Sequence, residues 1–101
     1  MSKTVVLITG ANTGLGYQMV RGLCASGRPY AILVGSRSLD KAQKAVDDAA
    51  AEFPSTQSSL RAIQVDIESD VSIEAAEKTV RAEFGKLDAL VNNAGKFLIE
   101  S

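Results

Sequence analysis

The sequence has 101 residues, 46% of them hydrophobic and 23% charged, which fits one folded globular domain and excludes a disordered or membrane-embedded chain. Eleven basic and twelve acidic residues leave a net charge of -1, and the basic residues are scattered, so we expect neither a nucleic acid nor a membrane as partner. One cysteine and no histidine exclude an internal disulfide, a zinc site and a His-based catalytic triad, so no metal is expected.

Four short apolar runs, at 5–8, 31–34, 60–65 and 87–91, predict β-strands. They are partly β-branched and bounded by turn residues, as is typical of strands buried on both faces of a sheet. The first run is too short for the core of a signal peptide, and none approaches the roughly 18 residues of a membrane span. Together with the single cysteine, this favours a cytoplasmic location.

The three segments between these strands have helical periodicity. Their apolar positions are Leu15, Met19 and Leu23 in the first, Ala42, Ala45, Val46, Ala49, Ala50 and Phe53 in the second, and Ile73, Ala76, Val80 and Phe84 in the third. Gly27 and Gly85 are candidate stops for the first and third helices. Ser38 and Ser69 are candidate N-caps for the second and third.

This alternation of strands and helices predicts a doubly wound α/β sheet of Rossmann type. Strands separated by helices pair in parallel through right-handed crossovers. We expect the whole chain, 1–101, to form a single dinucleotide-binding unit.

A glycine-rich turn follows the first predicted strand, where residues 9–16 read TGANTGLG. A strand that turns directly into a helix leaves the first helical amides unpaired and aimed at one spot, which suits a phosphate. Gly10 would shape the turn, Gly14 would admit a pyrophosphate, and Gly16 would let the helix pack closely on the strand. A P-loop is not predicted, because it needs Lys and Ser or Thr after its last glycine. The alternative is a turn that binds no ligand.

The second strand ends in Gly35, Ser36 and Arg37, where dinucleotide-binding proteins usually carry an acid for the adenosine ribose. Without a carboxylate a 2′-phosphate is not repelled, and a guanidinium can form a forked pair with it. We therefore predict NADP in preference to NAD. The alternative is a solvated surface arginine.

Two further motifs follow the third and fourth strands. Asp66, in the triplet VDI, lies at the same sheet edge as the glycine turn and would accept a hydrogen bond from the adenine amino group or cap a turn. Residues 92–95 read NNAG and fall at the crevice where the strand order reverses, although asparagine and glycine also suit an ordinary turn.

Taken together, TGANTGLG, Arg37, VDI and LDALVNNAG resemble the short-chain dehydrogenase/reductase family, over nearly the whole chain. The resemblance implies the strand order 3-2-1-4 and is strongest to the NADP-preferring, carbonyl-reductase-like members. It implies these cofactor contacts: Gly10, Asn12, Thr13, Gly14, Leu15, Gly16, Arg37, Asp66, Ile67, Asn93, Ala94 and Gly95. Thr13 stands where those members carry a basic residue, which leaves Arg37 as the one expected cationic partner of the 2′-phosphate.

In the resembled family a Tyr-x-x-x-Lys pair beyond NNAG performs acid/base catalysis. The tyrosines here, Tyr17 and Tyr30, are followed four residues later by Arg21 and Val34, so no catalytic residue is predicted. The expected function is that of the cofactor-binding N-terminal half of an NADP-dependent oxidoreductase, whose carbonyl or alcohol substrate would require a C-terminal half. The alternatives are a noncatalytic NADP-binding protein, which senses the cofactor or pairs with another subunit, and a truncated product.

The resemblance also implies an exposed sheet edge. With the order 3-2-1-4, the strand at 87–91 would be an open apolar edge. Right-handed crossovers would then put the first two helices on one face of the sheet and the third helix alone on the other. We therefore expect marginal stability as a monomer, or self-association through that edge. Cys24, on the first helix, is expected to be packed and inert.

Overall fold

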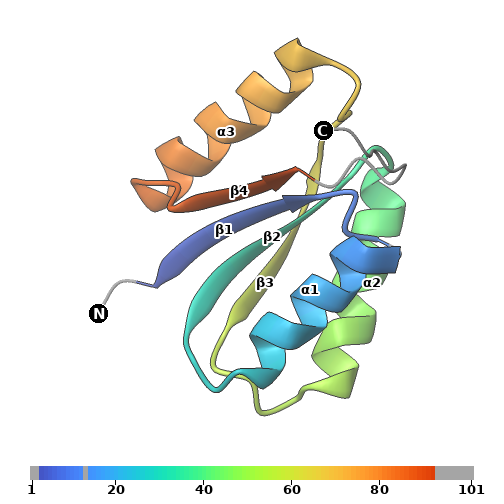
Figure 1. Cartoon of the computed structure of the whole chain (residues 1–101), viewed down its shortest axis with the longest axis vertical. Helices are drawn as coiled ribbons and strands as arrows, with labels where there is room; N and C mark the ends of the chain where they lie inside the picture. The colour runs from blue at the N-terminus through green and yellow to red at the C-terminus, as the bar shows by residue number, and fades with distance from the viewer. Residues whose placement is uncertain (1–2, 13, 93–101) are drawn as a thin grey trace.

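The computed structural model describes residues 3–12 and 14–92 (Figure 1). Strands and helices alternate along the chain, as predicted. In order they are β1 (Thr4–Thr9), α1 (Gly14–Ala25), β2 (Tyr30–Ser36), α2 (Leu39–Glu52), β3 (Ser59–Gln64), α3 (Asp70–Phe84) and β4 (Ala89–Asn92). No helix within these described ranges is long and apolar enough to cross a membrane.

The four strands form one parallel sheet in the order β3-β2-β1-β4, which confirms the predicted topology. β1 lies at the centre, where Leu7 is in register with Leu33 of β2 and with Leu90 of β4. Because successive side chains of a strand point to opposite faces, β1 supplies apolar residues to both sides of the sheet.

Two separate cores lie on the two faces of this sheet. Val6 and Ile8 of β1 belong to the core under α1 and α2, whereas Val5 and Leu7 belong to the core under α3. Figure 1 shows the same division, with α1 and α2 on one side of the sheet and α3 on the other. The prediction that the first two helices share a face is therefore confirmed.

The apolar stripe predicted for the first helix is wrong in part. Leu15 is 72% exposed and Met19 is 39% exposed, and the residues that α1 buries are Gly16, Val20 and Cys24. The helix packs through small side chains, which lets it lie close to the sheet. Leu15 and Met19 each precede a buried residue by one position, about 100° around the helix, and so fall on the adjoining face.

Burial on both faces is confirmed for β1 and β2 but not for the outer strands. In β3 exposed and half-buried residues alternate, and in β4 three of the four residues are exposed. The predicted bounds also shift: Leu87 precedes β4 and packs against the core under α3, and Val65 follows β3. Val65 nevertheless still donates its backbone N–H to the carbonyl of Ser36, at 2.9 Å.

The predicted helix caps are confirmed. The Ser38 hydroxyl accepts from the backbone N–H of Lys41, and the Ser69 hydroxyl accepts from that of Ser72. Gly85 follows α3 with φ at +79°, a left-handed conformation that glycine adopts without strain. These caps fix where α2 and α3 begin and where α3 ends.

Candidate cofactor site

The turn between β1 and α1 has the backbone that its glycines were predicted to provide. Gly10 has φ at +62° and Gly14 has φ at +61°, values that are strained for any residue with a side chain. A Cβ added to Gly14 would meet nothing within 4 Å, so the space beside the start of α1 is open. The first turn of α1 carries no acidic residue. The first amides of a helix have no partner within the helix, and without an acidic residue beside them they favour an anion such as a pyrophosphate.

A backbone hydrogen bond ties this turn to the end of β2. The N–H of Ala11, a fully buried residue, donates to the carbonyl of Gly35 at 2.9 Å. Gly16 is also buried, as close packing of α1 on the sheet requires. Thr13 lies outside the described residues, whereas Asn12 is half-buried and Leu15 exposed beside the turn.

Gly35 has a role that sequence reasoning did not assign to it. A Cβ built there would lie 2.8 Å from Cγ1 of Val65 and 3.0 Å from the carbonyl oxygen of Ile8. The ends of β1, β2 and β3 therefore approach too closely for any side chain at this position. A glycine within a strand is the signal that would have indicated such an approach.

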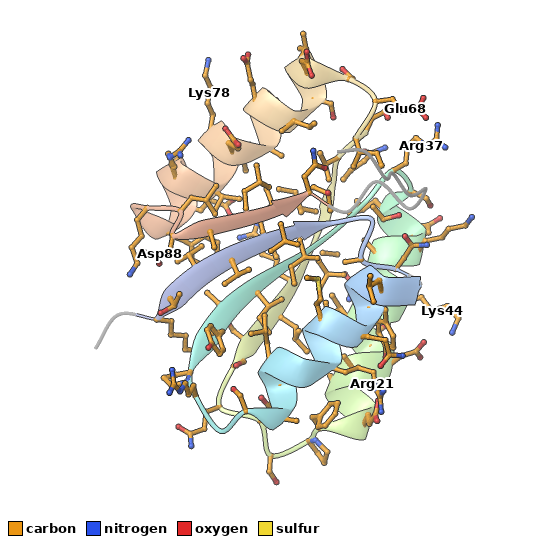
Figure 2. All side chains as sticks on the ribbon, in the orientation of Figure 1. Arg21, Arg37, Lys44, Glu68, Lys78 and Asp88 are labelled. Carbon is orange, nitrogen blue, oxygen red and sulfur yellow. The ribbon has the colours of Figure 1, made fainter. Side chains whose placement is uncertain are left out.

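Arg37 extends from the loop between β2 and α2 and is exposed. Among the residues that the structure describes, its guanidinium has no hydrogen-bond or ion-pair partner, whereas Arg21 pairs with Glu52 and Arg61 pairs with Glu83. Figure 2 shows the Arg37 side chain at the carboxyl end of the sheet, in the same region as Glu68. Its charge is thus available to an anionic ligand at this edge.

Asp66 forms the turn between β3 and α3. One carboxylate oxygen accepts from the backbone N–H of Glu68 at 3.0 Å, and the Asp66 N–H donates to the Ser72 hydroxyl at 2.9 Å. This is the turn-capping role named as one of its two predicted roles. Ile67 is half-buried in the same turn.

At the end of β4 the structure adds a contact that the sequence did not indicate. The buried Thr9 hydroxyl donates to the side-chain oxygen of Asn92 at 2.8 Å and so joins the ends of β1 and β4. The remaining predicted residues of this motif, Asn93, Ala94 and Gly95, lie outside the described residues.

The structure thus brings the glycine turn, Arg37 and Asp66 to the carboxyl ends of three adjacent strands. Two side chains of α1 have a shifted pKa. Burial, and next the charge of Asp48, raise the pKa of Tyr17. Burial raises the pKa of the Cys24 thiol, which is packed as expected. The described part of the chain holds no cluster of three or more metal-ligating side chains. The arrangement is suited to holding an anion.

Comparisons with known proteins show the family of this chain. The profile of the short chain dehydrogenase family matches residues 4–100. The chain is 48% identical over 94 residues to the short-chain dehydrogenase/reductase eupG of a Phoma species, which covers 92% of this chain and 34% of that protein. It is 38% identical over 96 residues to a carbonyl reductase of Mus musculus whose name specifies NADPH, covering 93% of this chain and 32% of the relative.

Solved structures give the same result. Menthone neomenthol reductase from Mentha piperita superposes with a TM-score of 0.80 at 27% identity, over 93% of this chain and 32% of that one. L-sorbose reductase from Gluconobacter frateurii, solved with NADPH and L-sorbose, gives a TM-score of 0.77 at 29% identity, over 99% and 36%. The chain therefore spans about a third of the length of the relatives that it matches. With the match over residues 4–100 and the parallel sheet in the order β3-β2-β1-β4, this chain belongs to the short-chain dehydrogenase/reductase family.

Proposed function

We propose that the chain is the cofactor-binding N-terminal part of an oxidoreductase that uses NADP(H) on a carbonyl or alcohol substrate. The observation that carries this proposal is Arg37, an exposed arginine without an ion-pair partner among the described residues, at the strand end where an NAD-binding protein would carry an acid. The cofactor would supply or accept the hydride when bound. The residues of this chain would bind and orient it.

The glycine turn would hold the pyrophosphate. The first amides of α1 have no partner within the helix and would donate to the phosphate oxygens, and the open space at Gly14 would let the ligand approach. Gly10 and Gly14 supply the left-handed backbone that aims them. Because the turn is tied to Gly35 by the Ala11 bond, this geometry is set before a ligand arrives.

The adenosine end would lie across the ends of β2 and β3. The Arg37 guanidinium would form charge-assisted hydrogen bonds to the 2′-phosphate. Asp66 would face the adenine, since the bond to Glu68 uses one of its two carboxylate oxygens. We propose Asn93, Ala94 and Gly95 for the nicotinamide side from their sequence motif alone.

The relatives support the phosphate form of the cofactor. The name of the mouse carbonyl reductase specifies NADPH, and the L-sorbose reductase structure contains NADPH. Both are similar to this chain over at least nine-tenths of its length.

A titration with NADPH and NADH tests the proposal. Arg37→Asp should weaken NADPH binding by about 10- to 100-fold, because a hydrogen-bonded charge pair is lost and a like charge replaces it. It should not weaken NADH binding and should strengthen it where the new carboxylate accepts from the ribose 2′-hydroxyl. Arg28→Asp is the matched control, since Arg28 is an exposed arginine in the loop before β2, at the opposite end of that strand. Equal affinities of the unaltered chain for NADPH and NADH would contradict the proposal.

A further inference from the structure

We propose that Gln64 is a positioning residue that holds Arg37 in place for a 2′-phosphate, and so contributes to the choice between NADP and NAD. The inference rests on the proposed function, because it assigns to Gln64 a part in the same adenosine site. It concerns a side chain that neither the sequence motifs nor the family resemblance indicated.

The contact is a hydrogen bond from a side chain to the backbone. The side-chain amide of Gln64, the last residue of β3, donates to the carbonyl of Arg37 at 3.1 Å. Gln64 is in register with Ser36, the last residue of β2, and Val65 donates the next backbone bond to the Ser36 carbonyl. The Gln64 amide thus adds one bond beyond the point where the backbone pairing of β2 and β3 ends.

With this bond, three consecutive carbonyls at the end of β2 have partners. Gly35 accepts from Ala11 of the glycine turn, Ser36 accepts from Val65, and Arg37 accepts from Gln64. The first two donors are backbone amides, which any residue supplies. The third depends on the side chain at position 64, which makes it the one of the three bonds that a substitution can remove.

The bond matters because Arg37 lies between two fixed points. Ser36 belongs to the sheet, and Ser38 caps α2. Two bonds orient the peptide between Arg37 and Ser38: its N–H donates to the Ser36 hydroxyl at 3.3 Å, and its carbonyl accepts from the side chain of Gln64 at 3.1 Å. The bond from Gln64 is the one of the two that comes from a neighbouring strand. An arginine side chain on a fixed backbone loses less conformational freedom when it binds a ligand than one on a mobile loop. The bond should therefore favour the ligand that Arg37 contacts and have little effect on one that it does not contact.

Adenosine 2′,5′-bisphosphate and 5′-AMP are suitable probes, because they differ by the 2′-phosphate and need no nicotinamide site. Both are titrated against the 101-residue chain, the variants Gln64→Met and Arg37→Ala, and the double variant. Gln64→Met keeps the length of the side chain and removes the donor. Gln57→Met is the control, since Gln57 is exposed in the loop before β3, at the other end of that strand.

We expect Gln64→Met to lower the ratio of the two affinities by about three- to tenfold, as the loss of one hydrogen bond predicts, and Gln57→Met to leave it unchanged. In the Arg37→Ala background Gln64→Met should have no further effect, because residues that act together are not additive. Gln64→Ala also removes the donor but adds no long apolar side chain at this exposed position. It should lower the ratio of the two affinities as much as Gln64→Met does. Thermal unfolding of each variant separates a folding defect from a binding effect.

The possible outcomes separate a failure of this inference from a failure of the proposed function on which it rests. If the unaltered chain prefers the bisphosphate and Arg37→Ala removes that preference, an unchanged ratio in both Gln64 variants would overturn the inference and leave the proposed function standing. If the Gln64 variants bound adenosine 2′,5′-bisphosphate and 5′-AMP more weakly by the same factor, the inference would also be overturned, because Gln64 would then have only a structural role. No preference in the unaltered chain would overturn the proposed function, and the inference with it.

Discussion

β3 and β4 are the outer strands of the described sheet, but they differ in their side chains. Polar side chains make contacts at two positions along β3, whereas on β4 the last residue, Asn92, accepts from Thr9. On β3, Arg61 pairs with Glu83 of α3, and Gln64 bonds to the Arg37 carbonyl. β4 contains Ala89, Leu90 and Val91, and Leu90 is 37% exposed. Charged side chains on an edge strand hinder pairing with another chain, whereas an exposed apolar edge invites it.

The difference shows that β3 suits contact with solvent, whereas β4 has the apolar residues of a strand that is covered. β3 has the alternating, partly polar pattern of a strand that ends a sheet. β4 is mostly exposed although its residues Ala89, Leu90 and Val91 have the composition of an interior strand, whereas the two central strands, β1 and β2, are buried almost throughout. Substitutions that compare the same residue type at the centre and at each edge therefore measure how much each strand contributes to stability.

Leucine occurs at all three kinds of position. Leu33 in β2 is 2% exposed, Leu60 in β3 is half-buried, and Leu90 is partly exposed. Leu33→Ala should lower the free energy of unfolding by about 3 kcal/mol, because it leaves a cavity in the core between the sheet and α3 that cannot collapse fully. Leu60→Ala should cost about half as much, and Leu90→Ala less than 1 kcal/mol. Urea denaturation measures all three, and equal losses would contradict the division into centre and edges.

Gly35 tests the centre in the opposite sense, by adding atoms. Gly35→Ala should lower the free energy of unfolding by about 1–3 kcal/mol, because the carbonyl of Ile8 belongs to the backbone and cannot move aside as a flexible side chain would. Gly22→Ala is the control, since Gly22 lies within α1 and a Cβ there would meet nothing within 4 Å. That substitution should stabilise the chain by about 0.5–1 kcal/mol. A neutral Gly35→Ala would contradict the close approach of the three strand ends.

Leu90 also allows a test of the apolar edge. The apolar composition of β4 keeps self-association of the 101-residue chain through this strand a prediction. Leu90→Lys should then lower the sedimentation coefficient at high concentration towards the monomer value, because a charged edge strand resists pairing. Its effect on stability should stay within about 0.5 kcal/mol, as for other exposed sites. Ser59→Lys on β3 is the control, and a monomer at every concentration before substitution would contradict the prediction.

The sequence predicted the order of elements, the parallel topology and both serine caps, because these depend on local periodicity, handedness and single polar residues. It failed for Leu15 and Met19, since periodicity identifies a helix but does not say which of two adjoining faces packs when small residues occupy one of them. At the site, the glycine turn was predictable, because the left-handed backbone of such a turn favours glycine. The Gln64 bond and the Thr9 bond to Asn92 were not, because both join residues distant in the chain through side chains common on any surface.

Asp88 gives the smallest expected effect, at the start of the apolar edge. Its carboxylate accepts the Val5 N–H at 2.7 Å, and its own N–H donates to the Val5 carbonyl at 3.0 Å, so these bonds join the start of β4 to β1. The bond from Val5, and next Lys86 at 3.2 Å, hold the pKa of this carboxyl below its usual value. A lowered pKa in the folded state means that the contribution to stability is present above the usual value and is lost as the pH falls through the folded one.

Asp88→Asn keeps an oxygen that can accept from Val5 but does not titrate. The unfolding free energies of the unaltered chain and of this variant should therefore converge as the pH falls below about 4, and stay apart at neutral pH. Lys86→Met should leave part of this pH dependence in place, because the bond from Val5, the larger cause, remains. Denaturation series between neutral and acid pH measure the difference. Parallel curves for Asp88→Asn and the unaltered chain would show that the carboxylate charge does not hold β4 to β1, and that the neutral hydrogen bonds suffice.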